Sequence, residues 1–124
     1  MKQGTALVVT SLLSILLTTL HLTDDIVRGI APAGLTNLTA VVFWVVWLYA
    51  TVVLAERRAG YVIILLASVV GAGVPVLHMT GSGIAPSRGG FFFAWTLLAL
   101  AVTATFSVIL SARGLWSLRR PQPR

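Results

Sequence analysis

The sequence predicts an all-α membrane protein, a single domain built as a bundle of four transmembrane helices. Composition is the first reason, because the 124-residue chain is 57% hydrophobic and only 10% charged, with a mean hydropathy of +0.96. A soluble domain carries about 25% charged residues, so this chain lacks the polar groups that would cover its surface in water. The second reason is that the charged positions leave four long neutral windows, at residues 3–23, 29–55, 59–87 and 89–112.

Each window is long enough to hold one membrane helix, since about 20 apolar residues cross a hydrocarbon core of roughly 30 Å. We therefore expect helices at residues 4–23, 37–55, 60–78 and 90–112. Lys2 before the first apolar run is reminiscent of a signal peptide, but the run is longer than in a signal peptide. No small-residue cleavage site follows it. Residues 115–124 form a basic tail beyond the last helix.

Basic residues are unevenly distributed along this predicted topology. Lys2 precedes the first helix, Arg57 and Arg58 lie between the second and third helices, and four arginines follow the last apolar window: Arg113, Arg119, Arg120 and Arg124. The positive-inside rule then places both termini and the turn at 56–58 in the cytoplasm, with loops 23–36 and 79–89 facing outward. The net charge of +6 thus reflects topology rather than nucleic-acid binding.

The location of these arginines also predicts a lipid partner. We expect the arginines of the C-terminal tail to contact anionic lipids of the inner leaflet, where each contributes about 1 kcal/mol. The short loops and small size favour a prokaryotic inner membrane.

The two outward loops share a motif. Residues 21–23 read HLT and residues 29–32 read GIAP, while residues 78–80 read HMT and residues 83–86 again read GIAP. VVLAER at 52–57 likewise matches VILSAR at 108–113. These collinear matches predict a tandem repeat of residues 1–58 and 59–114. The two helical hairpins would be parallel and related by a pseudo-two-fold axis along the membrane normal.

Polar residues of the first predicted helix recur every three or four positions and therefore share one face. They are Ser11, Ser14, Thr18, His21, Asp25 and Arg28. We expect the hydroxyl groups to bond across helices or to backbone carbonyls, as such groups usually do in membranes. The polar face should turn toward the bundle interior, so His21 and Asp25 should point into its outer mouth.

His21, Asp25 and His78 form the strongest candidate site. His21 and Asp25 lie one helical turn apart, and the repeat makes His78 equivalent to His21. Two imidazoles and a carboxylate suffice to hold Zn²⁺ or another divalent cation with one open position. Asp24 could orient one imidazole from outside the ligand set. The alternative is that these residues merely end the helix at the membrane surface, with Arg28 pairing with Asp24 or Asp25.

Aromatic residues give a second set of expectations. We expect interface anchors at Phe91, Phe92, Phe93 and Trp95 on the outer side and at Tyr61 and Trp116 on the inner side. Trp44 and Trp47 fall near the middle of the bilayer, where they either pack inside the bundle or stack on a bound lipid, quinone or porphyrin. A b-type haem ligated by His21 and His78 is therefore an alternative to a metal ion.

The sequence excludes some kinds of chemistry, and no motif in it identifies a reaction. The absence of cysteine excludes disulfides, thiolate metal sites and covalent haem attachment. No predicted span has a charge in its middle, whereas ion-coupled transporters usually need one. We therefore expect an accessory or ligand-binding membrane protein. The alternatives are a metal-dependent enzyme that uses His21, His78 and Asp25 as ligands with Asp24 as base, and a structural subunit of a homo- or hetero-oligomer.

Overall fold

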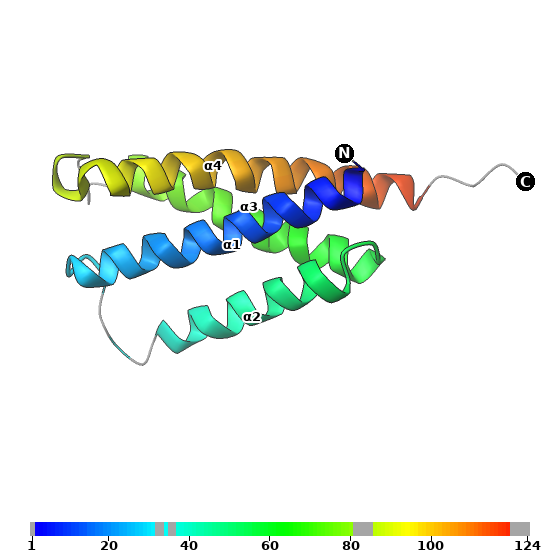
Figure 1. The fold of residues 1–124 in the computed structure, drawn as a ribbon, viewed down its shortest axis with the longest axis horizontal. Coiled ribbons are helices and arrows are strands. Elements are labelled where there is room, and N and C mark those ends of the chain that lie inside the picture. Colours follow the sequence, from blue (N-terminus) through cyan, green and yellow to red (C-terminus); the bar gives the residue numbers. More distant parts are fainter. Residues whose placement is uncertain (1, 32–33, 35–36, 81–85, 120–124) are drawn as a thin grey trace, which may run out of the picture.

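The four predicted helices are present in the computed structural model of the chain, where they form an all-α bundle (Figure 1). The structure describes residues 2–31, 34, 37–80 and 86–119, with side chains from residue 90 onward in the last range. The helices are α1 (Gln3–Val27), α2 (Leu38–Val53), α3 (Arg58–Thr80) and α4 (Pro86–Ser117). α1 continues beyond the predicted residue 23, so Asp25 lies within the helix.

Three of these helices are long and apolar enough to cross a membrane: Gln3–Val27, Arg58–Thr80 and the part of α4 from Gly90 to Ser117. α4 is interrupted at Gly90, whose φ of 66° lies in the left-handed region that favours glycine. The predicted span at 37–55 is shorter than expected. α2 has 16 residues, which cover about 24 Å and fall short of a hydrocarbon core of roughly 30 Å. The three long apolar helices make the chain an integral membrane protein.

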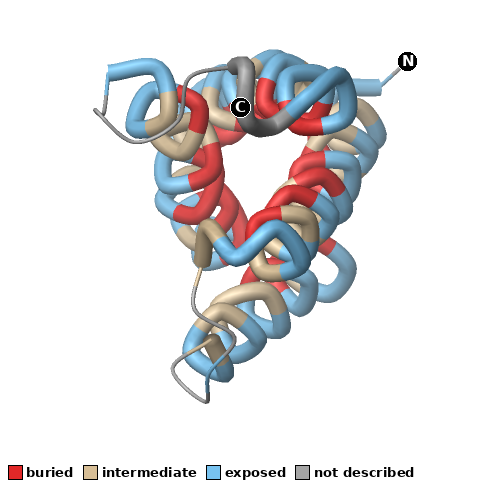
Figure 2. The backbone as a smooth tube through the Cα atoms, turned by 90° about the vertical axis from the view of Figure 1, so that its left-hand side faces the viewer, coloured by how far each residue is buried: buried red, intermediate tan, exposed pale blue. Residues whose placement is uncertain are grey.

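The helices run back and forth along one axis. α1 and α3 begin at the end of the bundle where α4 finishes, and α2 and α4 run in the opposite direction (Figure 1). Viewed along that axis, α4 and α2 lie on opposite sides with α1 and α3 between them, and the buried residues face inward (Figure 2). The outer faces expose large apolar side chains, among them Leu16, Val42, Leu66 and Leu98. Such faces are suited to contact with lipid rather than water.

α2 is attached to the bundle by its C-terminal half. Trp47, Ala50 and Thr51 are buried there, whereas no residue in the first half of the helix is buried. The indole N–H of Trp47 donates to Ser11 Oγ at 2.8 Å, and Ser11 Oγ lies 2.7 Å from Thr51 Oγ1. The Trp47 ring also packs against Gly71 of α3, where an added Cβ would lie 3.2 Å from the ring. These contacts join α2 to both α1 and α3.

Hydroxyl groups form a regular seam between α1 and α4. Ser14 Oγ donates to Thr103 Oγ1 at 3.1 Å, and Ser107 Oγ donates to Thr10 Oγ1 at 3.0 Å. Each step of four residues along α1 is matched by four residues back along α4, as expected for antiparallel helices in constant register. The predicted polar face is confirmed, because its members Ser11 and Ser14 are fully buried.

The start of α3 packs closely against the end of α4. The Tyr61 ring lies over Gly114, and a Cβ at Gly114 would collide with it. The prediction that Tyr61 is an interface anchor is wrong, because the side chain is buried in this contact. At Gly60, the residue before Tyr61, an added Cβ would collide with the carbonyl of Leu54. Two glycines therefore fix the geometry of α3 at its start.

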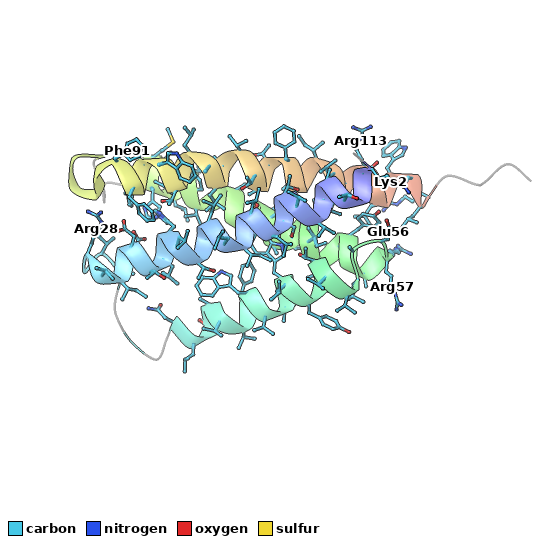
Figure 3. The ribbon with its side chains drawn as sticks, in the orientation of Figure 1. Lys2, Arg28, Glu56, Arg57, Phe91 and Arg113 are labelled. Atoms are coloured by element: carbon cyan, nitrogen blue, oxygen red, sulfur yellow. The ribbon has the colours of Figure 1, made fainter. Side chains whose placement is uncertain are left out.

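Charged side chains gather at the two ends of the bundle (Figure 3). At the end where α1 begins and α4 finishes lie Lys2, Glu56, Arg57 and Arg113. Arg28 lies at the opposite end. Of the other tail arginines, Arg119 is exposed, while Arg120 and Arg124 lie outside the described residues.

The tandem repeat stays a prediction. The repeat would make α2 equivalent to α4, yet these helices have 16 and 32 residues. Most of the second GIAP segment, residues 83–85, lies outside the described residues, as does Pro32 of the first. The parallel directions of α1 and α3 agree with a repeat without requiring one.

Gly114→Ala should destabilise the fold by about 1–3 kcal/mol, because the added methyl group overpacks the contact with Tyr61. Gly73→Ala is the matched control, since a Cβ at Gly73 meets no atom within 4 Å. In that helical position alanine should be neutral or stabilising by up to about 1 kcal/mol. Thermal unfolding of the two variants in detergent measures the difference. Equal stabilities would contradict the close contact between α3 and α4.

Candidate metal centre

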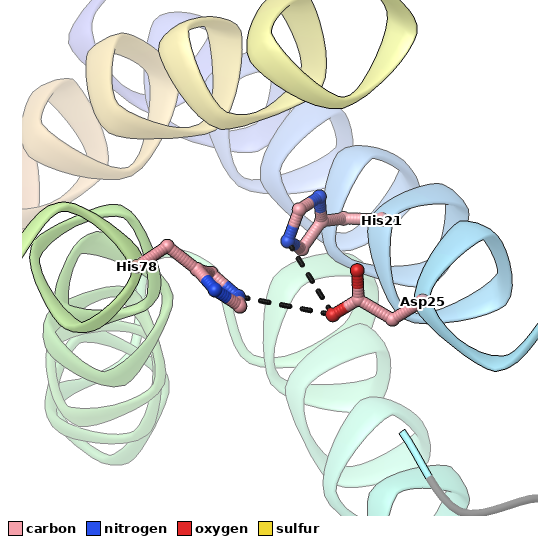
Figure 4. A group of neighbouring side chains, drawn as sticks. All are labelled: His21, Asp25 and His78. Atoms are coloured by element: carbon pink, nitrogen blue, oxygen red, sulfur yellow. Dashed lines mark ion pairs between the residues drawn. The ribbon is translucent and has the colours of Figure 1, made fainter. Parts of the chain in front are cut away.

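His21, Asp25 and His78 meet at the end of the bundle opposite the chain termini (Figure 4). His21 and Asp25 project from the last two turns of α1, and His78 projects from the last turn of α3. Because α1 and α3 run in the same direction, their C-terminal ends lie at one level and bring the three side chains together. α4 begins at this end and closes the other side of the cluster.

A tight helix ending fixes the position of Asp25. Gly29 adopts a φ of 72°, and its N–H donates to the carbonyl of Ile26 at 3.0 Å. The N–H of Ile30 donates to the carbonyl of Asp25 at 2.8 Å. This is the Schellman arrangement, in which a glycine in the left-handed region ends a helix and pairs its last carbonyls. The glycine of the first GIAP segment thus has a structural role beside the cluster.

The three side chains are close together and shielded. Asp25 Oδ2 lies 3.7 Å from His21 Nε2 and 3.7 Å from His78 Nε2. The side chains of His21, Asp25 and His78 are 3%, 8% and 20% exposed. One ligand atom from each residue lies within 4.8 Å of the others. These separations are too long for hydrogen bonds, but two ligands of a tetrahedral Zn²⁺ ion are themselves roughly 3.4 Å apart.

Thr96 of α4 orients the His21 ring. Thr96 Oγ1 lies 3.1 Å from His21 Nδ1 and 3.0 Å from the carbonyls of Phe92 and Phe93. The hydroxyl has one proton, and donating it to these carbonyls leaves the oxygen free to accept from Nδ1–H. The hydrogen-bond network therefore assigns the proton of the neutral ring to Nδ1. The lone pair on Nε2 then points toward Asp25.

This arrangement leaves two electron-rich atoms of the cluster without a hydrogen-bond donor. His21 Nε2 and Asp25 Oδ1 are buried and have no hydrogen-bond partner among the described residues. A buried polar atom without a partner destabilises the fold by about 1–3 kcal/mol, and the penalty is larger where a charge is involved. A cation between Nε2 and the carboxylate would satisfy both groups at once.

Phe93 forms a wall of the cluster. Its ring centroid lies 5.0 Å from that of His21 and 5.4 Å from that of His78, and the side chain is buried. The prediction that Phe93 is an interface anchor is therefore wrong. The two imidazoles themselves meet edge to face with centroids 5.0 Å apart. Phe93 excludes water from the α4 side, so the partly exposed His78 marks the accessible side.

Asp24 is not part of the cluster. Its two carboxylate oxygens each accept a 2.8 Å hydrogen bond from Arg28 Nε, one turn further along α1. The sequence allows Arg28 to pair with either Asp24 or Asp25 at the end of the helix. The pair with Asp24 forms, and it draws the Asp24 side chain toward Arg28. The suggested role of Asp24 in orienting an imidazole is performed for His21 by Thr96.

Trp47 does not lie near the histidines. Trp47 is fully buried and bonded to Ser11, about 15 Å along α1 from His21. Trp44 lies on α2, as Trp47 does, and is half-buried. A haem held between two histidines needs its flat ring between them, whereas the His21 and His78 rings are in edge-to-face contact. The geometry favours a single ion over a haem.

Thr96 and Phe93 were not predicted as site residues. Both belong to α4 and lie outside the repeated motifs at 83–86 and 108–113, and each looks ordinary for a membrane helix. One signal was available, since they lie three residues apart on one helix face and near the end of α4 that an antiparallel bundle places beside His21.

Comparisons with the known protein families, with curated protein sequences and with solved structures give no match. The residues of this chain are therefore the sole guide to its function.

Thr96→Val should change the tautomer of His21, because valine cannot accept from Nδ1–H. ¹⁵N spectra of the imidazole nitrogens, recorded where the rings are neutral, should show Nδ1–H for wild-type His21 and a mixture in the variant. The chain has two histidines, so His78→Gln assigns the signals. Thr103→Val is the control, since Thr103 bonds Ser14 two turns away. Unchanged tautomers in Thr96→Val would contradict the assigned role.

Proposed function

We propose that this integral membrane protein binds one divalent transition-metal ion through His21 Nε2, His78 Nε2 and an Asp25 carboxylate oxygen. One observation carries the proposal: three ligand atoms from two helices lie within 4.8 Å of one another. The buried, unpartnered Nε2 of His21 is the clearest sign that a positive centre belongs there. The hydrogen bond that His21 Nδ1–H donates to Thr96 Oγ1 supports the same conclusion, since ligating histidines commonly donate their other N–H to an oxygen.

The donor set favours Zn²⁺ or a similar borderline ion. Imidazole nitrogen suits zinc, copper, iron and nickel, whereas Mg²⁺ and Ca²⁺ prefer sites made of oxygen. Two nitrogens and one oxygen would bind Zn²⁺ at about 2.0–2.2 Å. The ion would link α1 to α3, which makes ligand binding with a structural or accessory role the leading function.

A metal-dependent enzyme is the second candidate, and the number of ligands favours it. Structural zinc sites usually have four protein ligands, whereas catalytic sites have three and keep an open position. A water on that position could act as a nucleophile once the ion lowers its pKa. Asp24, which the sequence suggests as a base, is held by Arg28, so this alternative depends on the bound water.

We also propose the finer topology that the sequence predicts. The clustering of Lys2, Arg57 and Arg113 at one end of the bundle supports cytoplasmic termini (Figure 3). The metal centre would then lie near the extracytoplasmic surface, in a prokaryotic inner membrane. The shared loop motifs support duplication of an ancestral helical hairpin, which would account for the equivalent positions of His21 and His78.

Asp25→Asn should weaken Zn²⁺ binding by at least about 100-fold, because it removes the carboxylate charge while keeping the side-chain size. Asp24→Asn is the matched control on the neighbouring residue and should bind Zn²⁺ like the wild type. Competition with a chelator of known affinity measures the dissociation constant of each detergent-purified variant. Elemental analysis should give one ion per wild-type chain and none in the double variant His21→Ala/His78→Ala.

Equal weakening by Asp24→Asn and Asp25→Asn would show that Zn²⁺ binds to general surface charge. A wild-type protein that retains no stoichiometric transition metal would overturn the proposal. It would favour the remaining alternative, a structural subunit of a membrane complex.

A further inference from the structure

We infer that α3 and α4 form a binding site for the headgroup of an anionic phospholipid, at the end of the bundle opposite the metal centre. A pocket of about 150 Å³ lies between the start of α3 and the end of α4. It is lined by Arg58, Val62, Leu115, Leu118 and Arg119. The inference is independent of the metal centre, because none of these residues contributes to it.

The two positive charges that line this pocket favour the binding of an anion. Arg58 and Arg119 come from different helices and line the same small space. Among the described residues, the ion pairs of the bundle all lie at the other end, on Asp24 and Asp25. Neither pocket arginine therefore has a carboxylate partner in the described structure. Two guanidinium groups without a counterion repel each other, and a phosphate can accept hydrogen bonds from both.

Arg58 is also in an unusual place for a cation. It is the first residue of α3, where the helix dipole is positive and a basic side chain is unfavourable. Arg58 therefore does not stabilise its own helix. A bound phosphate would be attracted both by the guanidinium group and by the positive end of α3.

The walls of the pocket indicate a lipid rather than a free phosphate ion. Val62, Leu115 and Leu118 are apolar and partly or largely exposed, so they can contact an acyl chain below the headgroup. The membrane-spanning segment of α3 begins at Arg58, and that of α4 ends at Ser117. The two arginines thus lie at the level of the headgroups, where basic pockets between membrane helices bind anionic lipids.

The contact between Tyr61 and Gly114 explains why the two arginines share one pocket. It brings the start of α3 and the end of α4 into close approach, and Arg58 and Arg119 flank this contact along the chain. The pocket is therefore framed by packed helices rather than by a loop. Arg113 lies elsewhere, in a separate pocket with Gln3, Trp116 and Ser117.

Native mass spectrometry with an equimolar mixture of palmitoyl-oleoyl phosphatidylglycerol and phosphatidylcholine tests the inference, since the two lipids differ only in the headgroup. The wild-type protein should retain phosphatidylglycerol preferentially. Arg58→Gln/Arg119→Gln should lower that preference by about 25-fold, as two contributions of about fivefold each. Arg57→Gln is the matched control, because Arg57 neighbours Arg58 and does not line the pocket.

Two results would overturn the inference. If Arg57→Gln lowered the preference as much as the double variant, the lipid would respond only to the general positive field. If inorganic phosphate displaced phosphatidylglycerol, the pocket would be a site for a free anion. The double variant should show the same thermal unfolding in detergent as the wild type, which serves as the control for folding. If it does not, Arg119→Gln alone should lower the preference about fivefold, and no change would also contradict the inference.

Discussion

The structure depends on one constraint of the bilayer: a polar group inside the membrane must find its partner within the protein. The seam of α1 and α4 obeys it, because Ser14 bonds Thr103 and Ser107 bonds Thr10. The indole of Trp47 obeys it through Ser11. Four buried side-chain atoms of the described residues do not: His21 Nε2, Asp25 Oδ1 and the hydroxyl oxygens of Ser68 and Ser111. The metal proposal follows from the first two, which belong to one cluster of three ligand residues, rather than from residue type alone.

An ion at this position would also complete the assembly of the bundle. Hydrogen bonds join α1 to α4 and to α2, whereas at its C-terminal end α1 meets α3 through Asp25 and His78. A metal ion would replace the long contact between Asp25 and His78 with metal–ligand bonds and would fix the distance between the two helices. The opposite end is held differently, by the Tyr61 ring over Gly114. The two ends of α3 would then be held by different means, a packed contact at its start and a metal ion at its end.

Residue periodicity and charge placement were enough to predict the four helices and the inward face of α1. The prediction that His21, Asp25 and His78 lie together used the repeated loop motifs, whereas in the structure the parallel directions of α1 and α3 bring these residues together. Periodicity and charge placement predicted α2 at 37–55, within two residues of its observed ends at Leu38 and Val53, but did not reveal that this helix is too short for a full span. They also failed for Phe93 and Thr96, whose roles arise from contacts between helices. Asp24 and Asp25 are neighbours of one type, and only the helix geometry separates the ion-pair partner of Arg28 from the candidate ligand.

X-ray absorption at the zinc edge is the most direct test of the central claim, that a metal ion bridges α1 and α3 through two imidazoles and a carboxylate. The account predicts nitrogen and oxygen ligands at about 2.0–2.2 Å, with outer scattering from two imidazole rings that falls to one in His78→Ala. Scattering without imidazole, or unchanged by His78→Ala, would contradict it.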